Sequence, residues 1–202
     1  MPLPRIKPMI LERLACPFSH TDWIFEVKHD GFRGMAYIEA GEARLVSRRY
    51  HDYKSFPRLC DAIAAELNIS NAILDGEIVS VDHNGIAQFK QLMHRRLEPR
   101  YYAFDILWLD GKDLRGLPLI ERKSILRSVI PTASSSLLYV DHLEGCGEKL
   151  FDICCKMDLE GIVAKHKHGK YVSEPETSWA KIRNPRYTQI VGREEMFKKK
   201  AA

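Results

Sequence analysis

The stretch WIFEVKHDGFRGMAYIE, residues 23–39, places a cluster of charged residues between two apolar runs. Alternating apolar residues on both sides predict two strands, and an Asp-Gly pair is typical of the turn between them. A solvent-exposed turn would explain Asp30 and Gly31. It does not explain Lys28, which ends the apolar run that contains Trp23 and Phe25. Lys28 is therefore either an ordinary surface lysine or a reactive group.

Composition places the chain among ordinary globular proteins. It has 202 residues, of which 45% are hydrophobic and 29% charged, close to the average for soluble domains. No apolar run is long enough for a membrane span, and residues 1–18 lack the apolar core of a signal peptide. The five cysteines have no metal-like spacing, so we expect reduced thiols packed in a core rather than disulfides or zinc.

Positive charge is concentrated toward the C-terminus. Residues 161–202 contain ten Lys/Arg and four Asp/Glu, a net charge of +6, whereas residues 1–160 carry a net charge of −2. The basic part is the candidate surface for a polyanion. The last residues, FKKKAA, are as consistent with a solvated tail.

The pattern of apolar and turn residues predicts an α+β fold with antiparallel sheets flanked by helices. Ser55 is the expected N-cap of the first helix, with Pro57 in its first turn. The predicted strands cover residues 23–28, 32–40, 43–49, 72–82, 100–111, 136–143, 160–166 and 178–183, and the predicted helices cover 55–67, 87–96, 118–130 and 146–157.

Charged residues recur inside or at the ends of these strands. Burying a charged side chain there without a partner would cost several kcal/mol or more. Singly, each suggests a surface position or an ion pair. Together they are the groups that phosphoryl transfer requires, namely cations for phosphate oxygens, carboxylates for a divalent metal and a nucleophile. No Walker-type glycine loop accompanies them. They are Lys28, Asp75, Glu77, Asp105, Glu160, Lys165, Lys181 and Arg183.

The hexapeptide from Lys28 to Arg33 resembles the K-x-D-G-x-R motif of covalent nucleotidyltransferases, which include ATP-dependent DNA ligases, RNA ligases and mRNA capping enzymes. Further motifs follow in the order of that family: SRR (47–49), LDGEIV (74–79), YYAFDILWLDG (101–111), EGIVAK (160–165) and WAKIR (179–183). The sequence is most similar to the ligase domain of bacterial multifunctional end-joining DNA ligases. The resemblance implies an ATP-grasp-like nucleotidyltransferase fold, the DNA ligase adenylation domain.

The resemblance also implies an activity. The chain would be an AMP-forming, ATP-dependent DNA ligase that adenylates its own lysine and passes AMP to the 5′-phosphate of nicked double-stranded DNA in repair and recombination. It would use ATP with Mg²⁺ or Mn²⁺ and lie in the bacterial cytoplasm, at the nucleoid. Two alternatives stay open: the same chemistry on RNA ends, or a non-sealing nucleotide- or nucleic-acid-binding module that needs a partner.

Site residues follow from matching the motifs. Lys28 would be the nucleophile, and Glu26 would accept a hydrogen bond from the adenine amino group. Phe104 would stack on the adenine, which suits its flat apolar ring. Lys181 would contact the α-phosphate. Arg183 stands where the family usually has a second lysine, and it would also contact the nucleotide.

The remaining assignments concern phosphate, metal and DNA. Arg33 and Arg48 would contact ribose or phosphate and later the DNA 5′-phosphate, together with Arg186. Glu77 would hold the ribose or a metal, and Glu160 a metal. Asp75 and Asp105 are expected to be structural supports, whereas for Arg49 and Lys165 a role in the site and a surface position are equally consistent with the sequence.

The motifs predict that residues 1–190 form the adenylation domain and residues 191–202 a basic tail. We expect neither an OB-fold nor an N-terminal DNA-binding domain in the 202 residues. Sealing would then be weak unless other DNA-repair proteins supply the missing clamp.

Overall fold

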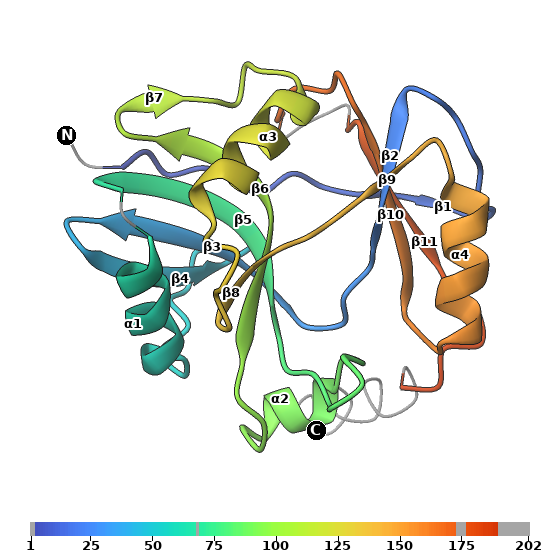
Figure 1. Ribbon diagram of the computed structural model, residues 1–202, viewed down its shortest axis with the longest axis horizontal. Helices are drawn as coiled ribbons and strands as arrows, with labels where there is room; N and C mark the ends of the chain where they lie inside the picture. Colours follow the sequence, from blue (N-terminus) through green and yellow to red (C-terminus); the bar gives the residue numbers. More distant parts are fainter. Residues whose placement is uncertain (1–2, 68, 173–176, 190–202) are drawn as a thin grey trace.

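The computed structural model describes residues 3–67, 69–172 and 177–189. Within these ranges the chain folds into two sheets and four helices (Figure 1). The strands are β1 (Glu12–Leu14), β2 (Trp23–Val27), β3 (Phe32–Glu39), β4 (Glu42–Ser47), β5 (Asn71–Val79), β6 (Arg100–Leu109), β7 (Lys112–Asp113), β8 (Leu137–Tyr139), β9 (Leu143–Glu144), β10 (Gly161–His166) and β11 (Trp179–Arg183). The helices are α1 (Pro57–Glu66), α2 (Phe89–Met93), α3 (Leu119–Val129) and α4 (Gly147–Lys156).

Both sheets are mixed. The first has the strand order β1-β11-β10-β2-β9, and the second has the order β4-β3-β5-β6-β7 with β8 beside β6. All pairs are antiparallel except β1 with β11 and β6 with β8, which are parallel. The predicted α+β class is confirmed. The predicted antiparallel pairing holds for the other pairs, and these two parallel pairs are exceptions because each joins strands that no hairpin connects.

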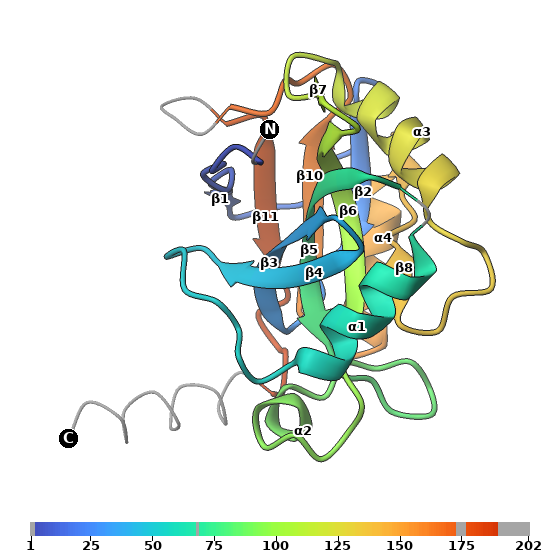
Figure 2. The same cartoon turned by 90° about the vertical axis from the view of Figure 1, so that its left-hand side faces the viewer.

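Three apolar cores hold the layers together. One lies between the second sheet and the helices α1 and α3, and a second lies between the two sheets. The third lies between the first sheet and α4. Figure 1 shows α4 beside β10 on one side of the molecule, with α1 and α3 over the second sheet on the other, and Figure 2, seen from that second side, shows α1 beside β4. The space between the sheets is therefore the interior of the molecule.

The predicted elements are present, though the helix expected over 87–96 is the shorter α2; β1 and β7 lie outside the predicted strands, and two further differences follow. Helix α1 begins at Pro57 with Phe56 at the N-cap and no side-chain cap, so the prediction that Ser55 caps it is wrong; Ser55 Oγ instead accepts a hydrogen bond of 2.7 Å from Arg95. The predicted strand over 136–143 is two short strands, β8 and β9, which belong to different sheets.

All five thiols are free, but only Cys154 is buried, and Cys16 and Cys146 are exposed, so the expectation that the thiols pack in a core is wrong for these two. No helix in the described part of the chain has the length and apolar character that crossing a membrane requires.

Candidate active site

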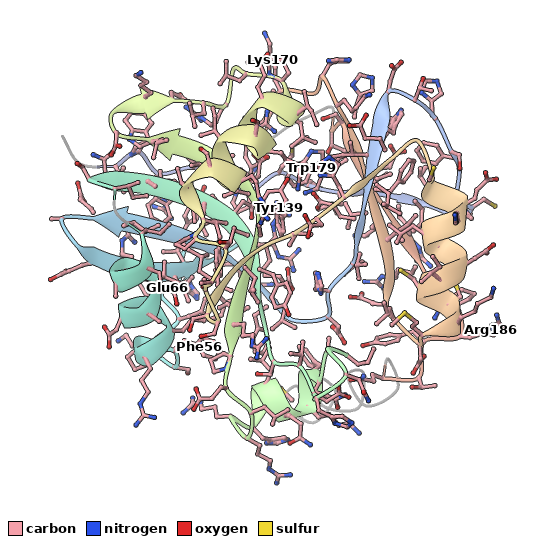
Figure 3. All side chains as sticks on the ribbon, viewed as in Figure 1. Phe56, Glu66, Tyr139, Lys170, Trp179 and Arg186 are labelled. Carbon is pink, nitrogen blue, oxygen red and sulfur yellow. The ribbon has the colours of Figure 1, made fainter. Side chains whose placement is uncertain are left out.

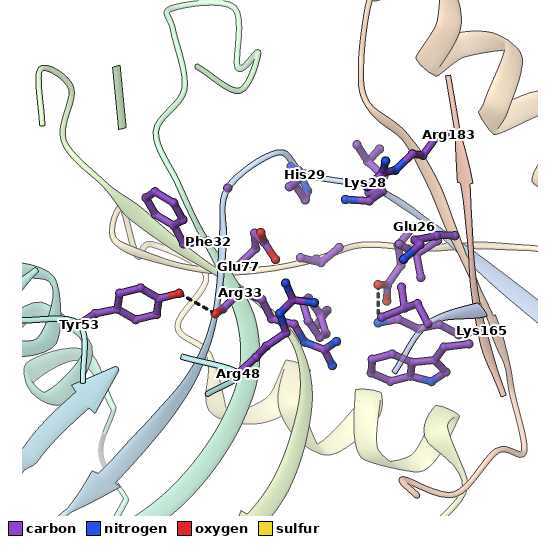
Figure 4. A pocket seen from close by; sticks show the side chains of 18 residues that line it. Glu26, Lys28, His29, Phe32, Arg33, Arg48, Tyr53, Glu77, Lys165 and Arg183 are labelled. Carbon is purple, nitrogen blue, oxygen red and sulfur yellow. Dashed lines mark hydrogen bonds and ion pairs between the residues drawn. The ribbon is translucent and has the colours of Figure 1, made fainter. Parts of the chain in front are cut away.

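A cavity of about 350 Å³ lies between the two sheets, within the usual size range of small-molecule sites. Figure 4 shows that its side chains come from both sheets. The structure brings eight of the predicted site residues to its wall: Glu26, Lys28, Arg33, Arg48, Glu77, Phe104, Lys181 and Arg183. Residues separated by more than 150 positions along the chain thus surround one cavity.

Strand alternation explains the wall that the first sheet forms. Successive side chains of a strand point to opposite faces, so Trp179, Lys181 and Arg183 of β11 all face the cavity. The register places Val163 of β10 between Lys181 on one side and Glu26 of β2 on the other. The prediction that Lys181 and Arg183 share one face is confirmed.

The second sheet forms the opposite wall. Arg33 of β3 pairs in register with Glu77 of β5, and both line the cavity. The β5–β6 ladder shifts register between Asp75 and Gly76, so that Phe104 has no partner residue across the ladder. A bulge of this kind turns a side chain out of the regular pleat. Here the residue at the bulge is Phe104, which lines the cavity.

Lys28 lies where the chain passes from one sheet to the other. Its backbone N–H donates to Gly161 O at 2.9 Å, and its ammonium donates to Glu160 Oε2 at 2.6 Å. Gly31 follows in the same connection, and a Cβ there would lie 2.1 Å from Ile78 O. The glycine is therefore required by the close approach of β5, and this contact fixes the segment that carries Lys28.

Positive charge gathers at the Lys28 end of the cavity. Burial lowers the pKa of Lys181, and the neighbouring cations Arg183, Lys28 and Arg48 lower it further. Glu160 is the carboxylate that opposes this effect; its Oε1 lies 3.7 Å from Arg183 Nε. Cations that destabilise one another's charge favour a bound anion. This end of the cavity therefore suits phosphate groups.

A buried carboxylate between two lysines lies farther into the cavity. Glu26 Oε1 is 2.5 Å from Lys123 Nζ, and Oε2 is 2.6 Å from Lys165 Nζ. Burial disfavours ionised Glu26, but the two ammonium groups outweigh it and lower the pKa of Glu26. Lys165 is itself buried, so this second ion pair lies inside the protein rather than at its surface.

Lys165 has an altered acidity. Burial lowers its pKa to about 8, against the opposing attraction of Glu26. Its ammonium lies over two aromatic rings, 4.3 Å from the Phe104 centroid and 4.1 Å from that of Trp179. Phe104 is half-buried and meets Trp179 edge to face at 5.8 Å. This end combines a flat apolar ring with polar groups, which suits a nucleobase.

Arg33 is held by the protein itself. Its Nε and Nη2 donate to the two oxygens of Asp75 at 3.1 and 2.7 Å, and Nη1 donates to Met9 O at 2.6 Å. Asp105 makes the same two-point pair with Arg122, at 2.9 and 2.8 Å. Both aspartates thus act as the structural supports that the sequence predicts.

A divalent metal fits this site only with help from a substrate. In the described part of the chain no three His, Cys, Asp or Glu side chains are grouped as a metal site. Glu77 lines the cavity and Glu160 contacts Lys28. Mg²⁺ is commonly bound by one or two carboxylates together with substrate phosphates, and these residues fit that arrangement.

Several groups in or behind the cavity wall were missed from the sequence, and three of them matter for its chemistry. Trp179 and Val140 line the cavity, and Lys123 lies behind it. A signal for Lys123 existed: the buried residues of α3 are Leu119, Arg122, Lys123 and Leu126. This is the spacing of the helix face that packs against a core. Two cations on that face, Arg122 and Lys123, indicate that buried carboxylates pair with them.

The other residues singled out in the sequence divide between the cavity and the surface. Arg186 is exposed and does not line the cavity; Figure 3 shows it at the periphery, away from Trp179. Of the two undecided residues, Lys165 lines the cavity, whereas Arg49 is exposed and does not line it. Residues 191–202, the predicted basic tail, lie outside the described residues.

Comparison with known proteins gives consistent matches. The family model of the ATP dependent DNA ligase domain matches residues 8–183. The SPbeta prophage-derived DNA ligase-like protein LigB of Bacillus subtilis is 28% identical over 195 residues, covering 92% of this chain and 70% of LigB. The multifunctional non-homologous end joining DNA repair protein LigD of Mycobacterium tuberculosis is 32% identical over 175 residues, covering 85% of this chain and 23% of LigD.

Solved structures agree. The ligase domain of M. tuberculosis LigD superposes with a TM-score of 0.77 and 30% identity, covering 87% of this chain and 58% of that one. A mycobacterial DNA ligase D complexed with ATP and MES gives a TM-score of 0.73 and 29% identity, covering 87% and 59%. The predicted nucleotidyltransferase fold of a ligase adenylation domain is confirmed.

Proposed function

Because the chain belongs to the family of ATP-dependent DNA ligase domains, we propose that it adenylates Lys28 with ATP and transfers the AMP to the 5′-phosphate of nicked DNA. The observation that carries this proposal is the position of Lys28 in the cavity. Its amine lies at the end where Lys181, Arg183 and Arg48 gather, and an aromatic ring lies at the other end. A nucleotide with its base at Phe104 would direct its phosphates toward Lys28.

The first step is attack by the Lys28 amine on the α-phosphorus. The N–P bond forms as the bond to pyrophosphate breaks, which leaves a lysyl-AMP phosphoramidate. An amine attacks only without its extra proton, and Glu160 Oε2 at 2.6 Å is positioned to accept it. Lys181 and Arg183 offset the negative charge that develops on the phosphate oxygens.

The second step uses the same cations. An oxygen of the DNA 5′-phosphate attacks the phosphorus of lysyl-AMP, the N–P bond breaks, and Lys28 is released. Arg48 is exposed at the cavity wall and can meet a phosphate that arrives from solvent. The proposed DNA contacts also include Arg33 and the peripheral Arg186. The guanidinium group of Arg33 is held by its two hydrogen bonds to Asp75.

Mg²⁺ or Mn²⁺ would be held by Glu77 and Glu160. When bound, the ion supplies neutralisation of phosphate charge. The proposed partners are nicked double-stranded DNA and DNA-repair proteins that help to hold it.

Intact-mass spectrometry tests the proposal. After incubation with ATP and Mg²⁺, we expect the protein to gain the mass of one AMP, and Lys28→Ala to gain none. Lys149→Ala, which removes an exposed lysine on α4, is the matched control and should be labelled like the wild type. Adenylated protein, freed of ATP, should then lose its AMP to a 5′-phosphorylated DNA nick at low salt. AMP retained by Lys28→Ala would refute the assignment of the nucleophile.

A further inference from the structure

Lys123 connects α3 to the cavity. The side chain is buried, with a relative exposure of 1%. Its ammonium donates to Glu26 Oε1 at 2.5 Å and to Val140 O at 2.8 Å. Glu26 and Val140 both line the cavity. A helix on the outer side of the second sheet therefore holds two groups of the cavity wall through one side chain.

Two cations act on the Glu26 carboxylate at this contact. Glu26 faces Lys123 from α3 and Lys165 from β10. His29, in the connection after β2, and His142, between β8 and β9, also lie within its electrostatic influence. Burial lowers the pKa of His29 to about 4 and also lowers the pKa of His142. At neutral pH the lysines are therefore the cations that act on Glu26.

Lys123 has further neighbours of its own. The ring of Tyr139, on β8, lies 4.6 Å from the ammonium, and Asp105, on β6, adds a favourable field. Burial disfavours the Lys123 cation, but Glu26 outweighs it and the pKa of Lys123 is raised. Lys123 thus stays charged, whereas Lys165, with a pKa of about 8, is the weaker of the two partners.

An ionised carboxylate can only accept hydrogen bonds. The corresponding edge of adenine carries an amino group, which donates, whereas that of guanine carries a keto oxygen, which accepts. A fixed carboxylate therefore favours adenine and repels guanine. A protonated carboxyl group would lose this distinction, because it can donate as well as accept.

We propose that Lys123 is a positioning residue for nucleobase selection: it fixes the Glu26 carboxylate as an acceptor at the cavity wall, so that the site prefers a purine with an amino group to one with a keto group. The proposal rests on the proposed function in placing the base at this end of the cavity. Lys123 does not itself touch the base. Without it, Glu26 keeps only Lys165, and burial then favours the protonated carboxyl group.

The test compares ATP and GTP affinity, measured by calorimetry, for the wild type and Lys123→Met. We expect the preference for ATP to fall at least about tenfold, which is the size of one charge-assisted hydrogen bond. The loss should grow as pH falls, because the pKa of Glu26 rises in the variant. Arg127→Met is the matched control: it removes a cation from α3 that lies 5.2 Å from the same Tyr139 ring, and it should leave the ATP preference unchanged.

A wild type without ATP preference, or a folded Lys123→Met with unchanged preference, would overturn the proposal. If Lys123→Met does not fold, the double variant Glu26→Gln/Lys123→Met removes both charges of the pair and must also lose the preference. Binding does not require Lys28 chemistry. A protein that selects ATP through Lys123 but never becomes adenylated would refute the proposed function alone.

Discussion

Replacing Phe104 with alanine tests whether the half-buried ring is a platform for the base. Stacking of a base on an aromatic side chain contributes about 1–3 kcal/mol, so ATP affinity should fall by a factor of about 5 to 150. The same substitution removes one of the two rings beneath the Lys165 ammonium, while Trp179 at 4.1 Å and Glu26 at 2.6 Å remain. We therefore expect the Lys165–Glu26 ion pair to remain in the variant, and the main loss to be the aromatic ring on which the base would stack.

Calorimetric titration with ATP measures the affinity, and urea denaturation measures the stability of the same sample. Phe104→Tyr retains the ring and should bind ATP close to the wild-type affinity. Because Phe104 is only half-buried, the alanine variant should lose no more than about 3 kcal/mol of unfolding free energy. A folded Phe104→Ala protein with unchanged ATP affinity would show that the ring is part of the core and that the base binds elsewhere.

Two predictions concern buried charges. Arg122→Met leaves Asp105 without its partner in a fully buried site. It should therefore lower the unfolding free energy, measured in urea, by about 3–5 kcal/mol. Adding Asp105→Asn should recover part of that loss, and a double variant with no recovery would contradict the pairing. Lys165 has a folded pKa of about 8 against an ordinary value of 10.5, so between these values the unfolded chain binds more protons and stability rises with pH. As pH rises across that range, the unfolding free energy of the wild type should increase by up to about 3 kcal/mol relative to that of Lys165→Met. If the unfolding free energies of the two proteins changed in parallel with pH, the lowered pKa of Lys165 would be refuted.

The local parts of the fold could be predicted from the sequence. Lys181 and Arg183 are two positions apart in β11 with Ile182 between them, so their shared face follows from period-two geometry alone. The helices likewise follow from apolar spacing. The division of 136–143 between two sheets could not be predicted, because it depends on which distant strand each half meets.

The site was predicted only where a motif marked it. Its nucleophile and the cations at one end come from matched motifs, whereas the environment of Glu26 depends on Lys123, which is 97 positions away in the sequence. The bulge at Phe104 arises from a shift in the pairing register between β5 and β6. The sequence of neither strand alone predicts that shift. Long-range pairing of this kind is a property of the folded chain.

The strand order has a consequence for synthesis of the protein. The second sheet uses strands between Phe32 and Tyr139, whereas the first sheet combines strands before Val27 with strands after Leu143. A chain leaving the ribosome can therefore pair the second sheet while β9 and β10, the two partners of β2, are still unmade. Lys28 emerges more than 130 residues before Glu160 and more than 150 before Lys181, so a nascent chain has its nucleophile long before it can hold a nucleotide against it.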